Sequence, residues 1–294
     1  MTSAVDVCAL VLAAGQGRRL RPITETIPKP LCPVGNVAPL DRALDRLARH
    51  DLAGPGRVAV NANYRADQIA AHVRDRAFIS LEPEALGTAG AVGHLRAWVA
   101  GRAVLVGNGD AYLAADPPAA EPGRDLAGLL DGWDGETVRV LVVPAADPGT
   151  AEFDGPSVFA GFSLLPAAVA AAIPPVRCDL VREVWRPAER AGCLELIRYD
   201  GLYLDTGTVP DYLAANLHAA GAGSLIAPDA VVTGTVERCV VGAGATVRGA
   251  ATRSVIFPGA VVAADEMLVD AVRLGSALTV TAAPGIGSGA RSLD

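Results

Sequence analysis

The sequence holds one lysine, Lys29, against 24 arginines. Lys29 stands in a basic stretch, because residues 15 to 30 also hold three arginines and a single acidic residue, although the whole chain has a net charge of -7. An ammonium is a compact point charge on a flexible stem and can follow a phosphate whose charge shifts, whereas a guanidinium is a rigid planar fork. We therefore predict that this stretch binds a small anionic ligand and that Lys29 contacts it. The alternative is a lysine left by chance on a solvated loop, which fits less well with the strand and glycine turn that precede it.

Two aspartates have the character of metal ligands. Asp110 and Asp205 each follow an apolar run and have a glycine close by, which lets the backbone approach a ligand. Mg²⁺ prefers oxygen ligands and usually takes only one or two carboxylates, leaving water and phosphate oxygens to complete its shell. The pair therefore predicts a Mg²⁺ site. The alternatives are a turn residue for Asp110 and, for Asp205, a turn or the N-cap of a helix over Val209 to Ala219.

The glycine loop before Lys29 matches two common phosphate-binding motifs only in part. A dinucleotide-binding fingerprint that begins with Gly15 and Gly17 needs a third glycine where this chain has Leu20, and no acidic residue follows at the expected distance. A Walker loop needs Gly-Lys-Ser/Thr, but Lys29 is flanked by prolines. We therefore expect a nucleotide-binding loop that uses glycine amides together with Arg19 and Lys29.

Strand-like runs alternate with helical patterns through the first half of the chain. We expect strands over residues 5–13, 57–62, 78–81 and 103–106, and helices over residues 40–50, 66–76 and 88–99. This alternation is typical of an α/β layer fold with a largely parallel sheet, whose ligands bind at the carboxyl ends of the strands. The glycine loop and Asp110 both fall at such ends. Residues 114–125 and 144–157 are rich in Pro, Gly, Asp and Ala and are expected to be loops.

The character of the sequence changes after Gly221. Small and β-branched residues recur at 227–232, 242–247 and 257–262, with a spacing of 15 residues. Such a short period predicts about three coils of left-handed parallel β-helix, of the hexapeptide kind, over residues 222–275. The predicted organisation is therefore an α/β domain at 1–221, a β-helix domain at 222–280 and a flexible tail at 281–294.

Composition limits the classes of function. An acidic chain argues against nucleic acid as a partner, and no apolar run reaches membrane-spanning length. The first four residues contain no basic n-region of a signal peptide, so we expect a cytoplasmic protein without membrane contact. The five cysteines are scattered and form no Cys-x-x-Cys pair, which argues against a disulfide framework or a zinc site.

The run Leu12 to Thr24, followed by Pro28-Lys29-Pro30-Leu31, resembles the Gly-x-Gly-x-Arg-Leu-x-Pro signature of the sugar-1-phosphate nucleotidylyltransferases. Further segments match in family order: 84–90 resembles the nucleotide-base segment, 106–110 and 204–208 the metal-binding segments, and 160–163 the sugar-side strand. The β-helix is similar to that of mannose-1-phosphate guanylyltransferases. The resemblance implies a Rossmann-like α/β nucleotidyltransferase domain with a mainly parallel mixed sheet, followed by a short C-terminal left-handed parallel β-helix.

The resemblance also implies roles for individual residues. It makes Arg19 and Lys29 the catalytic residues on the triphosphate, and Asp110 and Asp205 the ligands of a Mg²⁺ cofactor. The implied nucleotide-binding residues are Leu12, Ala13, Ala14, Gly15, Gly17, Arg18, Gly87, Thr88 and Asn108, and the sugar-phosphate-binding residues are Gly161 and Thr206. The substrates would be an NTP and a sugar-1-phosphate, converted to an NDP-sugar and pyrophosphate. A homo-oligomer through the β-helix or the sheet domain is expected.

The sequence departs from the family at one point. Many relatives carry Glu-Lys-Pro ahead of the sugar-side strand, with a lysine that grips the sugar phosphate, but this chain has no second lysine. In this it is similar to the compact N-acetylmuramate-1-phosphate uridylyltransferases. Arg182 and Arg186 are the candidate replacements. Three functions stay open: a mannose-1-phosphate guanylyltransferase-like enzyme, a uridylyl- or thymidylyltransferase for another sugar-1-phosphate, and a regulatory homologue with reduced catalysis.

Overall fold

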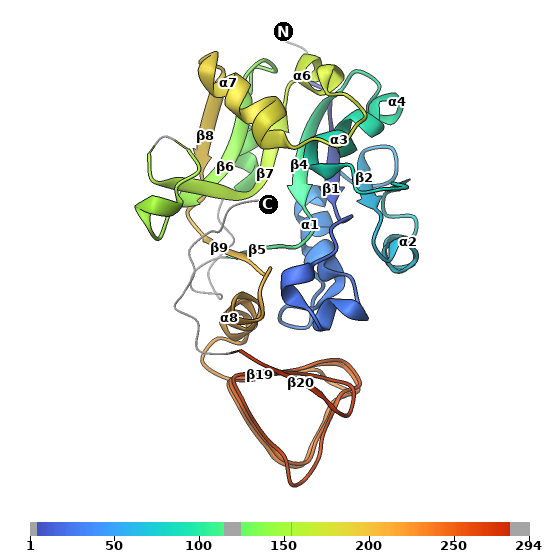
Figure 1. Ribbon diagram of the computed structural model, residues 1–294, viewed down its shortest axis with the longest axis vertical. Helices are drawn as coiled ribbons and strands as arrows, with labels where there is room; N and C mark the ends of the chain where they lie inside the picture. Colours follow the sequence, from blue (N-terminus) through green and yellow to red (C-terminus); the bar gives the residue numbers. More distant parts are fainter. Residues whose placement is uncertain (1–4, 115–124, 154, 283–294) are drawn as a thin grey trace.

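The structure is a computed structural model that describes residues 5–114, 125–153 and 155–282. It consists of a layered α/β part and a solenoid that is triangular in cross-section, with helix α8 (Val209–Ala220) between them (Figure 1). The predicted flexible tail lies almost entirely outside the described residues, and so does most of the loop expected at 114–125. None of the helices in the described part of the chain is long and apolar enough to cross a membrane.

A seven-stranded sheet forms the centre of the α/β part, in the order β3-β2-β1-β4-β7-β6-β8. Neighbouring strands are parallel except at β7, which runs antiparallel to both β4 and β6. The sheet is therefore mixed and mainly parallel, as predicted. Its strands are β1 (Val7–Leu12), β2 (Val58–Ala62), β3 (Phe78–Leu81), β4 (Ala103–Asn108), β6 (Val138–Pro144), β7 (Ser157–Leu165) and β8 (Leu194–Arg198).

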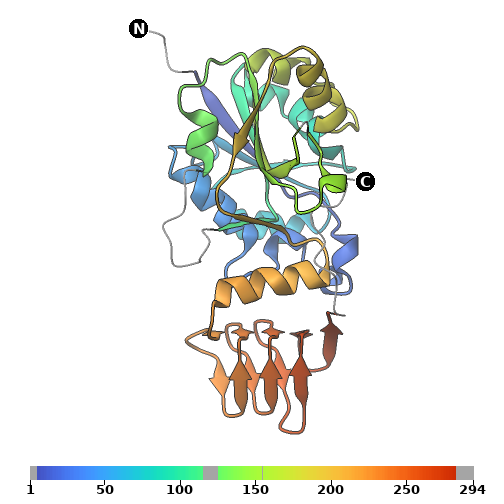
Figure 2. The same cartoon turned by 90° about the vertical axis from the view of Figure 1, so that its left-hand side faces the viewer.

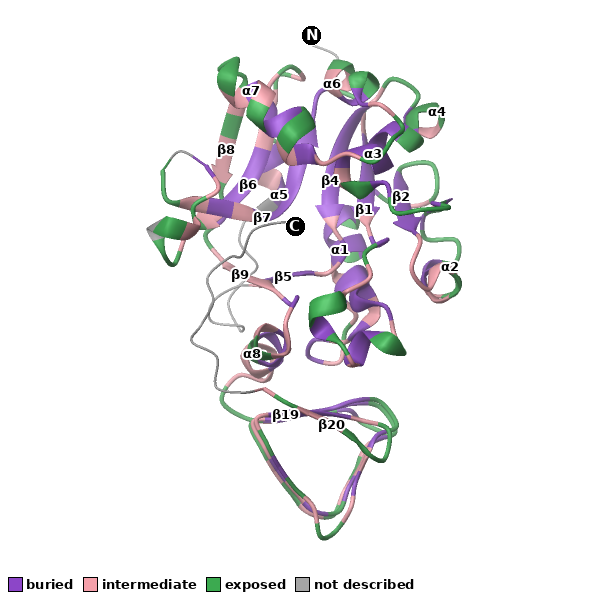
Figure 3. Ribbon diagram, in the orientation of Figure 1, coloured by how far each residue is buried: buried purple, intermediate pink, exposed green. Residues whose placement is uncertain are grey.

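Helices cover both faces of this sheet, because its central strands are apolar on both sides. In β1, Ala9 and Val11 pack into the cluster that contains α1, α2 and α5, while Cys8 and Leu10 pack into the cluster of α3, α4, α6 and α7. Figure 3 shows the resulting buried centre of the layered part. The helices are α1 (Pro39–Ala48), α2 (Ala66–Val73), α3 (Gly87–His94), α4 (Arg96–Val99), α5 (Asp125–Leu130), α6 (Ala167–Ala172) and α7 (Arg186–Arg190).

The expected elements are confirmed, with differences at their ends. The strand expected to end at residue 106 continues to Asn108, where it still pairs with β1. The helix expected over 88–99 is two helices, because Leu95 leaves the helical conformation (φ -85°, ψ 8°) between α3 and α4. Of the loop expected at 144–157, Pro144 and Ser157 belong to strands, and the described residues between them include one 3-10 turn at Pro148–Thr150 and a β-bridge from Phe153 to Ser157.

The solenoid is a parallel β-helix with three faces, as predicted (Figures 1 and 2). One face pairs Leu225 with Val240 and Val240 with Val255, which is the expected period of 15, but Val255 pairs with Val272 after a longer coil. The faces are formed by β10 (Leu225–Ile226), β13 (Val240–Val241), β16 (Val255–Ile256) and β19 (Ala271–Leu274); by β11 (Val231–Val232), β14 (Thr246–Val247) and β17 (Val261–Val262); and by β12 (Thr235–Glu237), β15 (Ala250–Thr252) and β18 (Met267–Val269). The last strand, β20 (Leu278–Thr281), turns back antiparallel to β19.

One apolar cluster joins the β-helix to the α/β part. It combines side chains of α8, of the segment that follows the glycine loop, and of the coils, among them Leu20, Ile23, Val34, Tyr212, Leu213, Val241 and Phe257. Asn36 Nδ2 also donates to the carbonyl of Val241 (3.0 Å). In Figure 2, α8 lies along the side of the β-helix that faces the α/β part. The segment that carries Lys29 is therefore packed between the sheet, α8 and the β-helix.

Candidate active site

The ammonium of Lys29 lies between two carboxylates. Its Nζ is 2.8 Å from Oδ2 of Asp110 and 2.9 Å from Oδ1 of Asp205. Arg19 adds a contact from Nη2 to Oδ2 of Asp205 at 3.2 Å. The Lys29 side chain is only 8% exposed, whereas those of Asp110 and Asp205 are 30% and 35% exposed. The structure thus brings together the two predicted catalytic residues and the two predicted metal ligands.

Backbone pairing places the two carboxylates side by side. Strand β5 (Ala111–Ala114) pairs antiparallel with β9 (Leu202–Asp205), in a register that sets Ala111 opposite Asp205. The Thr206 hydroxyl donates to the Asp110 carbonyl (3.0 Å) and holds the same junction. The N-cap of α8 is Thr208, whose side chain accepts from the Asp211 N–H. Asp205 is therefore not the helix cap considered as its alternative role.

The segment around Lys29 is restricted by its own sequence. Pro28 and Pro30 flank the lysine in a 3-10 turn over Lys29–Leu31, and each proline fixes its own φ. Gly17 adopts a left-handed conformation (φ +59°), and a Cβ there would lie 2.9 Å from Thr24 Cγ2 and 3.1 Å from Lys29 Cβ. A glycine is therefore required where the loop passes over the lysine.

The charges of the cluster hold one another ionised. Burial lowers the pKa of Lys29, but the carboxylates of Asp110 and Asp205 outweigh burial and raise this pKa above its ordinary value. Burial raises the pKa of Asp205, but Lys29 and Arg19 outweigh burial and lower this pKa below its ordinary value. Lys29 is therefore an ammonium and Asp205 a carboxylate at neutral pH.

The two carboxylates fit a Mg²⁺ ion. Both contact the same cation, the Lys29 ammonium, at 2.8 and 2.9 Å, so their oxygens converge on one region of space. Mg²⁺ needs only one or two carboxylates when phosphate and water oxygens supply the remaining ligands. Within the described ranges, no group of three or more His, Cys, Asp and Glu residues could hold an ion. A metal at this pair would therefore depend on oxygens from a bound ligand or water.

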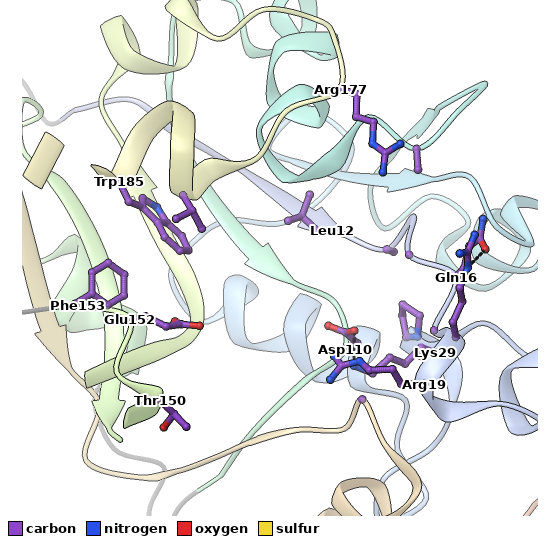
Figure 4. A pocket seen from close by; sticks show the side chains of 18 of the residues that line it. Leu12, Gln16, Arg19, Lys29, Asp110, Thr150, Glu152, Phe153, Arg177 and Trp185 are labelled. Carbon is purple, nitrogen blue, oxygen red and sulfur yellow. Dashed lines mark hydrogen bonds and ion pairs between the residues drawn. The ribbon is translucent and has the colours of Figure 1, made fainter. Parts of the chain in front are cut away.

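The cluster opens onto a cleft of about 1220 Å³. One wall carries the glycine loop with Arg19, Lys29 and Asp110, and the facing wall comes from residues 149–153 and from the helical segment 181–186. Figure 4 shows Thr150, Glu152, Phe153 and Trp185 on that facing wall. The main-chain N–H groups of residues 14–17 donate to no acceptor in the described part of the chain. A phosphate-bearing ligand at this loop would therefore meet unused amide donors.

Comparison with known proteins relates part of the chain that forms this cleft to a protein family. Residues 8–120 match the model of the family described as nucleotidyl transferase. This segment belongs to the nucleotidyl transferase family. It contains the glycine loop, Lys29 and Asp110, whereas Asp205 and the facing wall lie beyond the matched residues.

Two relatives of the chain have names that agree with this family match. The chain is 34% identical over 147 residues to an N-acetylmuramate alpha-1-phosphate uridylyltransferase of Caulobacter vibrioides, covering 47% of this chain and 57% of the relative. It is 32% identical over 132 residues to a mannose-1-phosphate guanylyltransferase of Mycobacterium tuberculosis, covering 43% of this chain and 33% of that relative. The chain thus spans less than two thirds of the length of these relatives.

A solved structure shares the fold. It is a putative glucose-1-phosphate thymidylyltransferase from Bacillus anthracis, with a TM-score of 0.59 and 19% sequence identity. The similarity covers 72% of this chain and 95% of that chain. At this identity the match shows a shared fold.

The predicted nucleotide-binding residues divide into two groups. The cleft wall of the nucleotidyl transferase segment includes Leu12, Ala13, Gly15, Gly17 and Arg18. Ala14, Gly87, Thr88 and Asn108 are not among the residues that line it, and neither are the predicted sugar-phosphate residues Gly161 and Thr206.

Residues of this second group hold the framework together. The Thr88 hydroxyl accepts from the N–H of Leu180 (2.9 Å), which ties the start of α3 to the segment that forms the facing wall. Gly87 has φ +75°, and a Cβ there would lie 2.4 Å from the carbonyl oxygen of Cys178. Gly161 likewise has φ +85°, and its Cβ would lie 3.0 Å from that of Ala111. These positions therefore fix backbone segments next to the cleft.

Two residues of the site were not predicted from the sequence. Asn61 accepts from the N–H of Ala13 (2.7 Å) through Oδ1 and donates through Nδ2 to Oε1 of Glu82 (2.8 Å). The other carboxylate oxygen of Glu82 accepts from the N–H of Leu86 (3.1 Å). Asn61 and Glu82 are both buried and connect the glycine loop to the segment that precedes α3. For Asn61, the available signal was a polar residue inside an apolar strand.

The structure separates the two arginines considered for the sugar phosphate. Arg182 has a side chain that is 85% exposed, pairs with Asp179 at 3.7 Å, and does not line the cleft. Arg186 lines the cleft, and its Nη1 is held by Oε2 of Glu189 at 2.6 Å. Arg177 also lines the cleft, although the sequence did not single it out.

Proposed function

We propose that the protein transfers a nucleotidyl group from an NTP to a sugar-1-phosphate, with Mg²⁺, to give an NDP-sugar and pyrophosphate. The observation that carries this proposal is Lys29, held between Asp110 and Asp205 beside a glycine loop with unused amide donors. The family match of residues 8–120 and the named relatives support the same reaction class.

The reaction requires no general base from the protein. A phosphate monoester has a second pKa near ~6, so the sugar phosphate is already a nucleophile at neutral pH. Its oxygen forms a bond to the α-phosphorus, the bond from the α-phosphorus to the bridging oxygen breaks, and that electron pair leaves with pyrophosphate. No proton has to be removed, and catalysis consists of positioning and of neutralising charge.

Each charged residue has a defined part in this scheme. The amides of residues 14–18 and the Arg19 guanidinium would hold the β- and γ-phosphates, and the Lys29 ammonium would follow the α-phosphate. Asp110 and Asp205 would hold Mg²⁺, which supplies charge neutralisation to the phosphate oxygens when bound. The 3-10 turn of Lys29 and the β5–β9 pairing keep these groups within reach of one another.

Arg186 is our candidate for the group that binds the sugar phosphate in place of the absent lysine. It lines the wall that faces Lys29, and Glu189 orients its guanidinium. An arginine binds phosphate through two parallel hydrogen bonds. Arg186→Met is expected to raise KM for the sugar-1-phosphate about tenfold while leaving KM for the NTP unchanged. Arg182→Met, outside the cleft, is the matched control.

A pyrophosphate-release screen tests the reaction and selects the substrates. Each common NTP is combined with Mg²⁺ and a panel of sugar-1-phosphates that includes mannose-1-phosphate and N-acetylmuramate-1-phosphate, because the relatives differ in base and sugar. We expect release with one preferred pair and none without the sugar phosphate. NTP binding without release for any pair would instead favour the regulatory homologue.

A further inference from the structure

We infer that Lys29 holds the place of the metal ion in the ligand-free protein, so that Mg²⁺ binds well only together with the nucleotide. The inference rests on the proposed role of Asp110 and Asp205 as metal ligands. Both carboxylates are already in contact with cations of the chain itself. Lys29 contacts each of them, and Arg19 is a second cation in contact with Asp205. The cluster therefore has two positive and two negative side chains and is neutral without any metal.

A metal between the carboxylates cannot coexist with this arrangement of Lys29. The ammonium lies 2.8 and 2.9 Å from the oxygens that would coordinate the ion. Mg²⁺ sits about 2.0–2.1 Å from its oxygen ligands, so it would require the same space and would place two positive charges directly beside a third. The ammonium has to move away before the ion is bound.

Moving the Lys29 ammonium away from both carboxylates would be unfavourable if no new partner received it. Its side chain is almost fully buried, and a buried ammonium that loses both carboxylates keeps its desolvation cost without compensation. A triphosphate in the cleft removes this obstacle because it offers oxygens to the ammonium and further ligands to the metal. The flexible stem of lysine permits the exchange, which a rigid guanidinium would resist.

The arrangement therefore couples the two ligands. Nucleotide phosphate draws Lys29 off the carboxylates and thereby raises their affinity for Mg²⁺, and Mg²⁺ raises the affinity for nucleotide by the same factor. In the free protein, the lysine keeps Asp110 and Asp205 paired and keeps stray divalent ions out of the site.

Calorimetric titration of Mg²⁺ alone into the ligand-free protein tests this inference. Lys29→Met removes the ammonium but keeps a long stem, and we expect it to bind Mg²⁺ at least tenfold more tightly than the unmodified protein. Mg²⁺ should also raise the melting temperature of Lys29→Met but not that of the unmodified protein. The matched control is Arg253→Met, which removes the same charge beside one carboxylate, Asp270 (2.6 Å), in the β-helix. It should bind Mg²⁺ no better than the unmodified protein.

The double variant Lys29→Met with Asp205→Asn identifies the site, because it should lose the gained affinity. If Lys29→Met does not fold, Lys29→Gln takes its place with the same expectation. Equal Mg²⁺ affinity in the unmodified protein and in the lysine variant would overturn the inference, and pyrophosphate release by the same preparation would leave the proposed function standing. Absence of Mg²⁺ binding in every variant, together with absence of pyrophosphate release, would overturn both.

Discussion

The cleft and the β-helix each bury a cation beside carboxylates, but the two cations are used differently. In the β-helix, the side chain of Arg273 is 3% exposed and pairs with Glu266. It also donates to the Thr279 hydroxyl (2.8 Å) and to the carbonyls of Val261 (2.9 Å) and Ser276 (3.0 Å). The protein itself supplies acceptors to all three nitrogens of this guanidinium. The fork is therefore a permanent part of the coil.

The Lys29 ammonium of the cleft is buried to a similar degree, yet its partners differ. It contacts two partly exposed carboxylates at the edge of a cleft of about 1220 Å³, and it donates to no main-chain carbonyl in the described part of the chain. A planar fork with several fixed donors suits a contact that is made once, whereas a point charge on a flexible stem suits a contact that is exchanged. The comparison therefore predicts that changes at Lys29 damage turnover and that changes at Arg273 damage stability.

The largest effect is expected for Lys29→Arg. The substitution keeps the charge, but the rigid fork cannot follow the α-phosphate as the ammonium on its flexible stem does. We expect kcat for pyrophosphate release to fall by about two orders of magnitude or more, which is the scale of losing one transition-state donor. The melting temperature should change little by comparison. Near-normal turnover in this variant would remove the distinction between the two cations.

Arg273→Met should produce the opposite result. Removing the guanidinium leaves Oε1 of Glu266 and the carbonyls of Val261 and Ser276 without this donor, and we expect the free energy of unfolding to fall by about 2 kcal/mol. This is less than for a fully buried pair, because Glu266 is 33% exposed and can be solvated. Chemical denaturation measures the change, and kcat is followed below the transition. A loss of kcat as large as that of Lys29→Arg would contradict the comparison.

Asp110→Asn and Asp205→Asn test whether the two carboxylates of the cleft bind Mg²⁺. Each is expected to raise the Mg²⁺ concentration for half-maximal rate about tenfold or more, since even outer-shell partners of metals have effects on this scale. Asp200→Asn is the control, because Asp200 is exposed and pairs with Arg198 on the surface. A variant of Asp205 that melts at a much lower temperature but keeps its Mg²⁺ response would make Asp205 a purely structural residue.

Much of this site was predictable because short motifs fix it locally. Gly17 and the prolines around Lys29 determine their own backbone geometry, and Asp110 follows a strand whose apolar run is plain in the sequence. The carboxyl ends of parallel strands meet at one edge of the sheet, so the convergence of the glycine loop and Asp110 followed from the predicted fold.

The rest depends on contacts that no local pattern encodes. Asn61 and Glu82 act through main-chain groups of Ala13 and Leu86, which depends on how β1, β2 and β3 pair. Thr88 is predicted to bind nucleotide, and what the sequence did not reveal is that its hydroxyl accepts from the N–H of Leu180, 92 residues away. In the β-helix, the spacing of 15 was visible, whereas the longer third coil, with Glu266 turned toward Arg273, was not.

The smallest expected effect is a change in acid stability. The pKa of Asp205 is lower in the folded protein than the value of about 3.9 usual for an unfolded chain. Such a group binds fewer protons when folded, so its contribution to stability is present above about pH 4 and is lost as the pH falls through the folded pKa. Melting temperatures of the unmodified protein should therefore decline below about pH 4 more steeply than those of Asp205→Asn. Asp200→Asn, which changes an exposed carboxylate outside this cluster, should keep the steep decline of the unmodified protein. Parallel curves for Asp205→Asn and the unmodified protein would mean that the Lys29 and Arg19 contacts add nothing to the stability of the ligand-free cleft.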